Sequence, residues 1–459
     1  MLAWAWSLFG VYLFVTALLA WHGGRKTTST QSFAIGSGRM NPWMAGLTLG
    51  ACTASSSLFV IMPGWVYADG LPALLGFGVS LIVGLSLGFW VFAPRFQEIG
   101  ADVGALTVPH WIGERYRSPL LRRVFAGLGL LQISYLVLVV VGCGYVMRDS
   151  LGISYQMSVV LIVVFVFGYT GFGGAWAHAL TNSLQGAIML VLAIVIFASG
   201  IEWWLDGSLW KDLASTGLVA PESQLFSTHA EVWIVQTIMV IGFCTQPQLL
   251  SKALYVDGRK HVGIMLLTAI AAVAVYTLVL FAGAYARLGL DEVVPQDQAA
   301  SRYYATAFLS APVGAAVTVT ILAASMSTLD GLIVALSASL SGDLIGKRAT
   351  VSTNRIVLTL IAIATAVLAL HPPELVQISA QIGIFALIAA SGGPLVAGLY
   401  LRGRLSALAA FCSATTALTI HFGMHFTGLN GGNPGIGSSI GLVAGIVVAV
   451  TLGRARAPA

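Results

Sequence analysis

Long apolar segments separated by short polar stretches occupy most of this chain. A membrane-spanning helix needs about 20 consecutive apolar residues. Segments of suitable length and hydrophobicity lie near residues 2–21, 42–68, 72–95, 121–147, 155–174, 179–201, 231–250, 262–286, 309–341, 355–370, 375–400, 404–424 and 436–452. The pattern predicts an all-α integral membrane protein with about 13 transmembrane helices.

The composition supports the same class. Hydrophobic residues make up 58% of the chain and charged residues only 8%, and the mean hydropathy is +0.90. The first segment has no basic residue before it and is followed by Arg25 and Lys26, which is the reverse of a signal peptide. We therefore expect this segment to remain as a helix.

Basic residues divide unevenly between the two sets of loops. With the N-terminus outside, every Lys and Arg except Arg148, Lys211, Arg287 and Arg302 falls in an inside loop, Lys252 included. Because positive charge concentrates on the cytoplasmic side of membrane proteins, we expect a multi-pass protein of the cell membrane, the cell inner membrane, with its C-terminus in the cytoplasm. The net charge of +5 then reflects topology and gives no indication of nucleic-acid binding.

Signatures of other functional classes are absent from the sequence. It has no GxxxxGK[ST] loop, no soluble domain longer than a loop and no cluster of His and Cys. The four cysteines fall in apolar segments without metal-type spacing and read as packing residues; they are Cys52, Cys143, Cys244 and Cys412. We expect neither enzymatic activity nor ATP hydrolysis.

Two of the apolar segments are interrupted by glycine, proline and polar residues. The second segment carries the polar run 52–57 between Gly50 and Pro63, and the seventh carries a break between Gly242 and Pro247. Matching breaks in two halves of a membrane protein indicate an inverted repeat, with substrate bound where the unwound backbone exposes its carbonyls. Two ordinary proline kinks are the alternative.

A second polar run, Ala324-Ser325-Met326-Ser327-Thr328, lies deep inside the ninth segment. A buried hydroxyl without a hydrogen bond costs about 1–3 kcal/mol. These hydroxyls therefore either bond back to the carbonyl four residues earlier or bind a ligand. In the second case the two polar runs face one site.

At these residues the chain resembles the sodium:solute symporters. The run from Ala324 to Thr328 resembles the A-x-M-S-T motif of that family, and Gln246-Pro247 resembles its Q-P signature. Gly173-Gly174 with the run 181–186 resembles its G-G-x(n)-T-D-x-x-Q-G stretch. The other matching stretches, in the expected order, are Gly50-Ala51 through Pro63-Gly64, Thr107-Val108-Pro109 and Arg115-Tyr116. The resemblance covers about residues 1–400.

The resemblance implies a LeuT-type core of two inverted five-helix repeats. Residues 1–41 then form an extra N-terminal helix and a cytoplasmic loop, 42–205 the first repeat, 206–400 the second repeat with its external loops, and 401–459 two C-terminal helices and a short tail. It also implies Na⁺ bound by the carbonyls of Ala51, Ala54 and Ala324 and the hydroxyls of Ser327 and Thr328. Such oxygens suit a hard cation, and the set contains no carboxylate.

Two further polar residues bear on the coupling ion. Many relatives have Asp where this chain has Asn182, and a neutral amide supports a second sodium less well, so we expect one sodium per cycle. Asp330 lies just beyond Thr328, and a carboxylate inside the membrane is a functional candidate. A hydrogen-bonded structural role for Asp330 is the alternative.

The solute site is less specific in the sequence. The candidates lie at the two breaks and on the fourth and eleventh segments; they are Ser55, Ser56, Ser57, Gln132, Tyr135, Phe243, Cys244, Thr245 and Gln381. No Lys or Arg falls at mid-depth of a predicted span. We therefore expect a small neutral or zwitterionic solute, or a monocarboxylate held by hydroxyls and a helix N-terminus.

The favoured hypothesis is a sodium-coupled secondary symporter that imports a small polar organic solute by alternating access. One alternative is proton coupling through Asp330 or His178. Another is a transporter-derived solute sensor, which the short tail without a signalling domain disfavours. The expected partners are the solute and the lipid bilayer, with no nucleic acid and no obligate protein partner.

Overall fold

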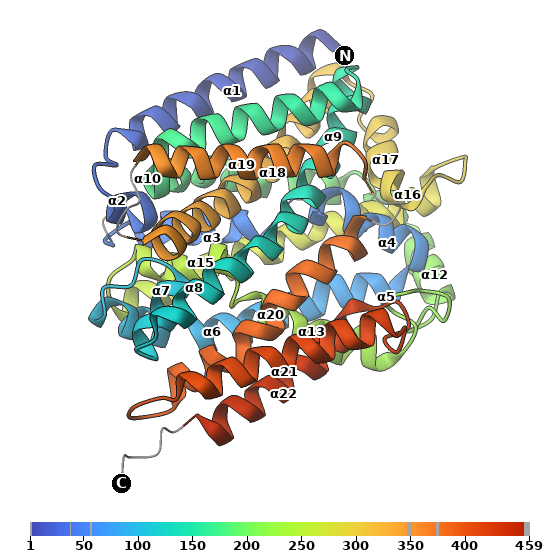
Figure 1. Cartoon of the computed structure of the whole chain (residues 1–459). Helices are drawn as coiled ribbons and strands as arrows, with labels where there is room; N and C mark the ends of the chain where they lie inside the picture. Colours follow the sequence, from blue (N-terminus) through green and yellow to red (C-terminus); the bar gives the residue numbers. More distant parts are fainter. Residues whose placement is uncertain (1, 37, 56, 347–350, 373–375, 454–459) are drawn as a thin grey trace.

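The computed structural model describes residues 2–36, 38–55, 57–346, 351–372 and 376–453. The regular structure in these ranges is helical (Figure 1). Ser56, one of the solute candidates, lies outside the described residues. So do Lys347, Arg348, Arg454 and Arg456, which contributed to the predicted orientation.

In the described part of the chain the predicted apolar segments are helical, apart from the breaks in the second and seventh segments and a few residues at segment ends. Nine helical stretches are long and apolar enough to cross a membrane; they are Leu2–Gly24 (α1), Leu71–Asp102, Pro119–Arg148, Gly173–Ala198, Gly258–Gly289, Ala311–Ile345, Val376–Tyr400 (α20), Ala407–Phe426 (α21) and Pro434–Leu452 (α22). Two bent pairs raise the number to eleven, and Tyr155–Gly171 and Ile356–Ala369 are shorter apolar helices. The all-α membrane fold is confirmed, and the total of thirteen crossings stays a prediction.

The fifth and sixth apolar segments run on as one bent helix, α10 (Tyr155–Ala198). The bend lies at Gly174, whose φ of 56° is in the left-handed region that glycine tolerates. A Cβ at this position would also lie 2.9 Å from the backbone of Phe33 in α2 (Thr30–Ile35). Gly174 therefore allows the chain to change direction between two spans without an intervening loop.

Short helices connect several of the spans, and their first residues match ordinary capping signals. α7 (Val108–Arg115) begins after Thr107, whose side chain accepts from the His110 amide at 3.0 Å. α8 (Pro119–Leu128) begins after Ser118, which accepts from the amide of Leu121. A hydroxyl at the N-cap satisfies amides that have no partner in the helix. The α7–α8 pair is thus fixed as a hairpin on one side of the bundle.

α18 (Ala311–Ser339) lies at the centre of the molecule, and nearly every side chain from Val317 to Ser337 is buried. It contacts α1, α3 (Pro42–Thr53), α9 (Ile133–Leu151) and α10. The polar run that begins at Ala324 therefore has no access to lipid. Its hydroxyls must find partners inside the protein.

α20, α21 and α22 pack closely together, with α21 and α22 side by side at one edge of the bundle (Figure 1). A Cβ at Gly393 of α20 would lie 2.6 Å from the carbonyl oxygen of Gly445 in α22. The Ser413 hydroxyl of α21 donates to that same carbonyl at 2.7 Å. Small residues thus bring these three backbones into close contact.

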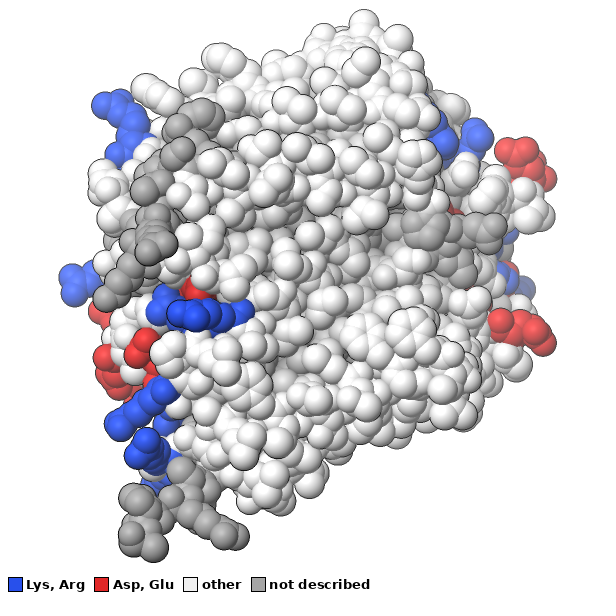
Figure 2. All heavy atoms as spheres, in the orientation of Figure 1, with Lys and Arg blue, Asp and Glu red and all other residues white. Residues whose placement is uncertain are grey.

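Charged side chains gather at two opposite ends of the molecule, and a broad uncharged band separates them (Figure 2). The helices run between the two ends (Figure 1). An uncharged band between charged ends, formed by helices rich in apolar residues, is the surface that a bilayer requires. The chain is a multi-pass membrane protein, and the orientation of its termini stays a prediction.

Candidate functional site

The second apolar segment breaks after Thr53, as the sequence predicts. α3 ends there, and Ala54 has extended dihedral angles, φ −96° and ψ 93°. The chain resumes as a π-helical turn (Ser57–Ile61) followed by α4 (Met62–Asp69), bent by 52° relative to α3. The last carbonyls of α3 therefore lack an ordinary continuing helix and are available to other partners.

The seventh segment breaks at the corresponding place. α13 (Gln236–Phe243) ends before Gln246, which is extended, and α14 (Pro247–Leu250) begins at a proline. The two parts are bent by 57°. Proline has no amide hydrogen to continue the helix, so the predicted interruption is confirmed here too.

The Ser327 hydroxyl bridges α18 and the broken end of α3. It donates to the carbonyl of Ala324 at 2.7 Å and lies 3.0 Å from the carbonyl of Ala51. The neighbouring Thr328 hydroxyl donates to the carbonyl of Cys52 at 3.2 Å. These side chains are fully buried. The structure therefore brings together four of the five oxygen-bearing residues that the resemblance implied.

The fifth residue, Ala54, is also buried, and its amide donates to the carbonyl of Gly50 at 3.1 Å. The carbonyl of Cys52 is an addition that the sequence did not single out. Three carbonyl oxygens and two hydroxyls thus lie at this junction. A hydroxyl oxygen has two lone pairs and can accept a cation when its hydrogen turns away, so the set is chemically suited to Na⁺.

Asn182 of α10 contacts both helices that form this junction, α3 and α18. Its amide nitrogen donates to the carbonyl of Ser327 at 2.9 Å and to the Cys52 sulfur at 3.1 Å. Asn182 lies well inside the second part of α10, nine residues after Gly173. The sequence also allows Asn182 to cap the start of the sixth segment, but its position inside the helix excludes that role, and it links α10 to both elements of the candidate cation site.

Asp330 is fully buried and hydrogen-bonded, on the face of α18 that meets α10. Its carboxylate accepts from Tyr169 at 3.0 Å and Thr181 at 3.3 Å, and it lies 3.0 Å from Nδ1 of His178. The far nitrogen of His178 is 3.6 Å from the Cys52 sulfur. The structural role considered for Asp330 is consistent with this network.

A cavity of about 90 Å³ lies beside the first break. Five of the predicted solute residues line it; they are Ser55, Ser57, Tyr135, Phe243 and Gln381. Its wall also includes Gln236 and Gln377, which the sequence analysis missed, and aromatic and aliphatic side chains such as Phe77 and Met239. The described lining residues carry no charge.

Hydrogen bonds order the polar wall of this cavity. Ser57 donates to Gln377 at 2.9 Å, and the hydroxyls of Ser55 and Tyr135 are 3.5 Å apart. The carbonyl oxygen of the Gln381 side chain is buried and has no hydrogen-bond partner in the described part of the chain. Gln377 and Gln381 lie four residues apart, on one face of α20. That spacing was a signal in the sequence that would have identified Gln377.

Three other predicted solute residues lie away from the cavity. Gln132 donates to Gln246 at 3.0 Å and also to Gln248. Cys244 packs against α6 (Ser80–Asp102), where a Cβ at Gly88 would lie 2.6 Å from its sulfur. Thr245 bonds back to the carbonyl of Gly242 at 2.6 Å. Each of these side chains has a local structural partner.

Lys252 is a correction to the sequence analysis, which placed it in an inside loop. It follows α14 in the short 3-10 helix Ser251–Tyr255 and is only 1% exposed. This helix continues the broken seventh segment into the interior. A charged residue that was expected in a loop thus lies buried inside the bundle, two residues after the end of the predicted seventh segment.

An ion pair joins the α7–α8 hairpin to the end of the ninth segment. Nε of Arg122 donates to Asp343 at 2.7 Å, and the hydroxyl of Thr107 donates to the other oxygen of that carboxylate. Arg115 holds the same hairpin to the end of α20, with Nε donating to the carbonyl of Gly398 at 2.8 Å. Charge-assisted hydrogen bonds therefore hold the α7–α8 hairpin against the ends of the ninth segment and α20.

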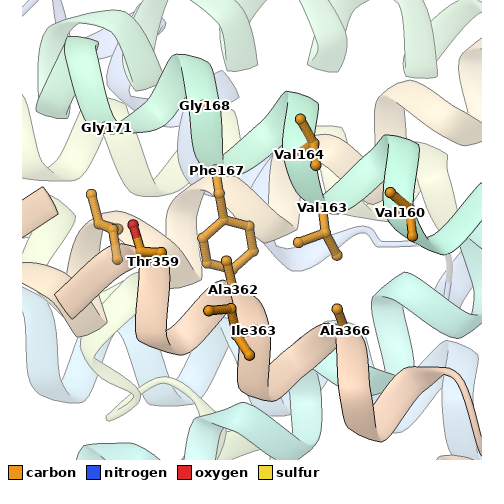
Figure 3. Close-up of a pocket in the computed structure, with 11 residues that line it drawn as sticks. Val160, Val163, Val164, Phe167, Gly168, Gly171, Thr359, Ala362, Ile363 and Ala366 are labelled. Atoms are coloured by element: carbon orange, nitrogen blue, oxygen red, sulfur yellow. The ribbon is translucent and has the colours of Figure 1, made fainter. Parts of the chain in front are cut away.

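A larger groove of about 460 Å³ lies on the surface between α10 and α19 (Val351–Ala369). Phe167 and Val163 of α10 face Ala362 and Ile363 of α19 across it (Figure 3). Its lining is almost entirely apolar, with the hydroxyl of Thr359 as the exception. It lacks the array of polar groups found around the 90 Å³ cavity.

The model of the Sodium:solute symporter family matches residues 33–402. This chain belongs to the sodium:solute symporter family. Its relatives include the sodium/proline symporter of Staphylococcus aureus, 25% identical over 357 residues that cover 73% of this chain and 67% of that protein. The osmoregulated proline transporter OpuE of Bacillus subtilis (strain 168) is 28% identical over 193 residues, 41% of this chain and 39% of that protein.

Solved structures confirm the fold of this sodium:solute symporter. A substrate-bound, outward-open Na⁺-coupled sialic acid symporter superposes with a TM-score of 0.77, covering 98% of this chain and 97% of that one at 17% identity. Mhp1, a nucleobase-cation-symport-1 family transporter, gives 0.59 at 14% identity. The protein is a transporter and not an enzyme, and its class of activity is sodium-coupled symport of a small organic solute.

Proposed function

We propose that the junction of α3 and α18 binds one Na⁺ and that the 90 Å³ cavity binds the co-transported solute. The sodium ligands are the carbonyls of Ala51, Ala54 and Ala324 and the hydroxyls of Ser327 and Thr328. The observation that carries this proposal is the Ser327 hydroxyl, within 3.0 Å of carbonyls from two different elements. The Cys52 carbonyl, 3.2 Å from Thr328, is a further oxygen of the same kind.

Sodium binding and solute binding are coupled because the residues of both sites lie at the same break in the second segment. Ala51 and Ala54 lie on the sodium side of this break, and Ser55 and Ser57 line the solute cavity a few residues later. A cation that draws the end of α3 to α18 therefore orders the residues that contact solute. Because the linkage between two ligands is reciprocal, bound solute increases sodium affinity by the same factor.

The cavity indicates the chemical class of the solute. Its wall contains hydroxyl and amide groups together with aromatic rings, and the described lining residues carry no charge. Transferring an unpaired ion to such a site would be costly. The solute is therefore neutral or zwitterionic, and the names of the two relatives make proline the first compound to test.

Uptake into proteoliposomes tests this function. A sodium gradient should drive accumulation of the solute, and replacing sodium with choline should abolish it. Uptake that persists in choline and follows a proton gradient would instead favour coupling through Asp330 and His178, which lie 3.0 Å apart. Solute binding without counterflow would favour a sensor.

Sodium-dependent uptake should have a Hill coefficient near one, because Asn182 presents a neutral amide beside the cation site. The Asn182 amide already donates to the Ser327 carbonyl at 2.9 Å. When the solute is neutral, each transport cycle should then move about one positive charge inward, which is the charge of the sodium ion. Asn182→Asp places a carboxylate among buried oxygens, and we expect it to add sodium cooperativity or a dependence on pH. A wild-type ratio of two sodium ions per solute would refute the single site.

Gln381→Leu should raise the solute KM by about tenfold while leaving protein stability unchanged or higher. The reason is that the side-chain oxygen of Gln381 is buried without a partner among the described residues, so its removal costs no hydrogen bond to them. The matched control is Gln132→Leu, which breaks the bonds to Gln246 and Gln248 and should lower the melting temperature. Equal loss of stability in both variants would assign Gln381 to packing.

A further inference from the structure

A narrow seam runs along α18 from the candidate sodium site toward the α7–α8 hairpin. α14 with the following 3-10 helix, and the start of α7, form its other side. Gly331 and Ser339 of α18 both line the seam and lie eight residues apart, so the seam extends about 12 Å along this helix. The α18 residues in its wall are Gly331, Val334, Ala335, Ala338 and Ser339.

The end of the seam at Gly331 lies next to the candidate sodium site. A Cβ at Gly331 would lie 2.7 Å from the sulfur of Cys52 and 3.2 Å from the ring of His178. The backbone carbonyl of the same Cys52 accepts from Thr328 at the junction of α3 and α18. Because Gly331 follows Thr328 by less than one turn of α18, the seam begins beside the oxygens that we assign to sodium.

The seam is closed in this structure but has a polar lining. Its volume is about 10 Å³, which is the lower limit for a single water molecule, about 10 Å³. The side-chain nitrogen of Gln248 and the hydroxyl of Ser339 are buried in its wall without a hydrogen-bond partner among the described residues. Because buried polar groups favour contact with water, the seam should fill with water when these helices separate.

Lys252 places a positive charge at the sodium end of the seam. Its Nζ would lie 3.6 Å from a Cβ at Gly331, and it donates to the backbone carbonyl of Gln248. Lys252 is buried and, in the described part of the chain, forms no ion pair with a carboxylate. The carboxylate of Asp330 is engaged by three other side chains. A cation without a directly paired carboxylate therefore lies where the seam begins.

We propose that the Lys252 ammonium is the barrier that keeps bound sodium from leaving along this seam. This inference rests on the proposed sodium site. A sodium ion that moves from Ser327 and Thr328 toward the α7–α8 hairpin must pass the ammonium beside Gly331. Two cations repel each other more strongly in the protein interior than in water. Sodium release along the seam therefore requires the ammonium to move away.

The position of Lys252 also connects this barrier to the solute cavity. The 3-10 helix that carries Lys252 directly follows α14, the second half of the broken seventh segment. The first half of that segment, α13, carries Phe243 and Gln236, which line the solute cavity. One broken segment therefore holds a solute contact on one side of its break and the sodium barrier on the other.

Efflux of ²²Na⁺ from proteoliposomes that contain the full-length protein and no solute tests the proposal. We expect efflux at least about tenfold faster in Lys252→Met than in the wild type, because this variant lacks the repelling charge. The sodium concentration that gives half of the maximal rise in melting temperature should fall about tenfold in the same variant. Lys252→Arg keeps the charge and should behave like the wild type in both measurements.

Two further variants show whether fast efflux passes through the sodium site. Lys260→Gln removes an exposed lysine that does not line the seam, and its efflux should equal that of the wild type. Adding Ser327→Ala to Lys252→Met should slow the efflux again, because the ion then loses a ligand at the site from which it enters the seam. Lys252→Gln also removes the charge and provides the same test if Lys252→Met does not fold.

Unchanged efflux in the neutral variants, or equally fast efflux in Lys252→Arg, would overturn the barrier. The melting temperature of the wild type separates this failure from a failure of the proposed function. A wild type that sodium does not stabilise would contradict the sodium site itself. A wild type that sodium does stabilise, together with neutral variants that release sodium no faster, would contradict only the role of Lys252.

Discussion

Replacing Ser327 or Thr328 by alanine is expected to raise the sodium concentration for half-maximal uptake by about tenfold, since each substitution removes one oxygen from a small ligand set. Solute affinity at saturating sodium should change much less. At low sodium the solute defect should reappear, because the two binding equilibria are linked. Initial rates of uptake measured across a matrix of sodium and solute concentrations provide both quantities.

Ser325→Ala is the matched control for this experiment. Ser325 lies on the same helix and is equally buried, and its hydroxyl donates to the carbonyl of Ile321 at 3.1 Å. It therefore illustrates the back-bonding role that the sequence alone allowed for all three hydroxyls. Sodium dependence that stays the same in Ser327→Ala and Thr328→Ala would remove the proposed cation site.

Arg122→Ala is expected to destabilise the protein by roughly 3–5 kcal/mol, the usual cost of leaving one member of a buried ion pair without its partner. Asp343 is the member left behind, and its side chain is only 1% exposed. Uptake should fall with stability, since the pair holds the α7–α8 hairpin against the ninth segment. Thermal unfolding in detergent and uptake per folded molecule measure the two effects.

Two control variants separate the loss of the Arg122–Asp343 ion pair from the loss of any arginine on this surface. Arg123 is exposed and adjacent in sequence, so Arg123→Ala should leave the melting temperature nearly unchanged. Arg122→Ala combined with Asp343→Asn removes the uncompensated charge and should recover part of the lost stability. A double variant less stable than Arg122→Ala would show that the carboxylate contributes through other contacts.

The fold was predictable because each span is encoded locally by its length and apolar content. The breaks at Thr53 and Gln246 were predictable for a similar reason, since Gly, Pro and polar residues within an apolar segment signal an interrupted helix. The polar run at Ala324 gave three residues of the cation junction, Ala324, Ser327 and Thr328, through a short motif. What the sequence analysis could not supply was how each helix is rotated about its axis.

That rotation explains the errors at the solute site. Gln132 and Tyr135 lie three residues apart on the fourth segment, and both were candidates for the solute site. In the structure Tyr135 lines the cavity, whereas Gln132 faces Gln246 and Gln248 of the broken seventh segment. Gln377 was missed although it lies one helical turn before Gln381, and only its bond to Ser57, 320 positions away, depends on tertiary packing.

Lys252 and Arg122 show a second limit of the sequence analysis. Both were counted only as positive charges in inside loops, a rule that concerns topology and not contacts. The structure buries Lys252 and pairs Arg122 with a carboxylate 221 positions away. Pairings of this kind depend on tertiary packing, which no local pattern in the chain reports.

The close packing of α20, α21 and α22 affects how the solute cavity changes shape. With the backbones of α20 and α22 almost touching at Gly393 and Gly445, α20 has little space to slide past its neighbours. Gln377 and Gln381 on α20 therefore cannot tilt alone. α21 and α22 must therefore move through the bilayer together with α20. The viscosity and thickness of the surrounding lipid then affect the rate of the transport cycle.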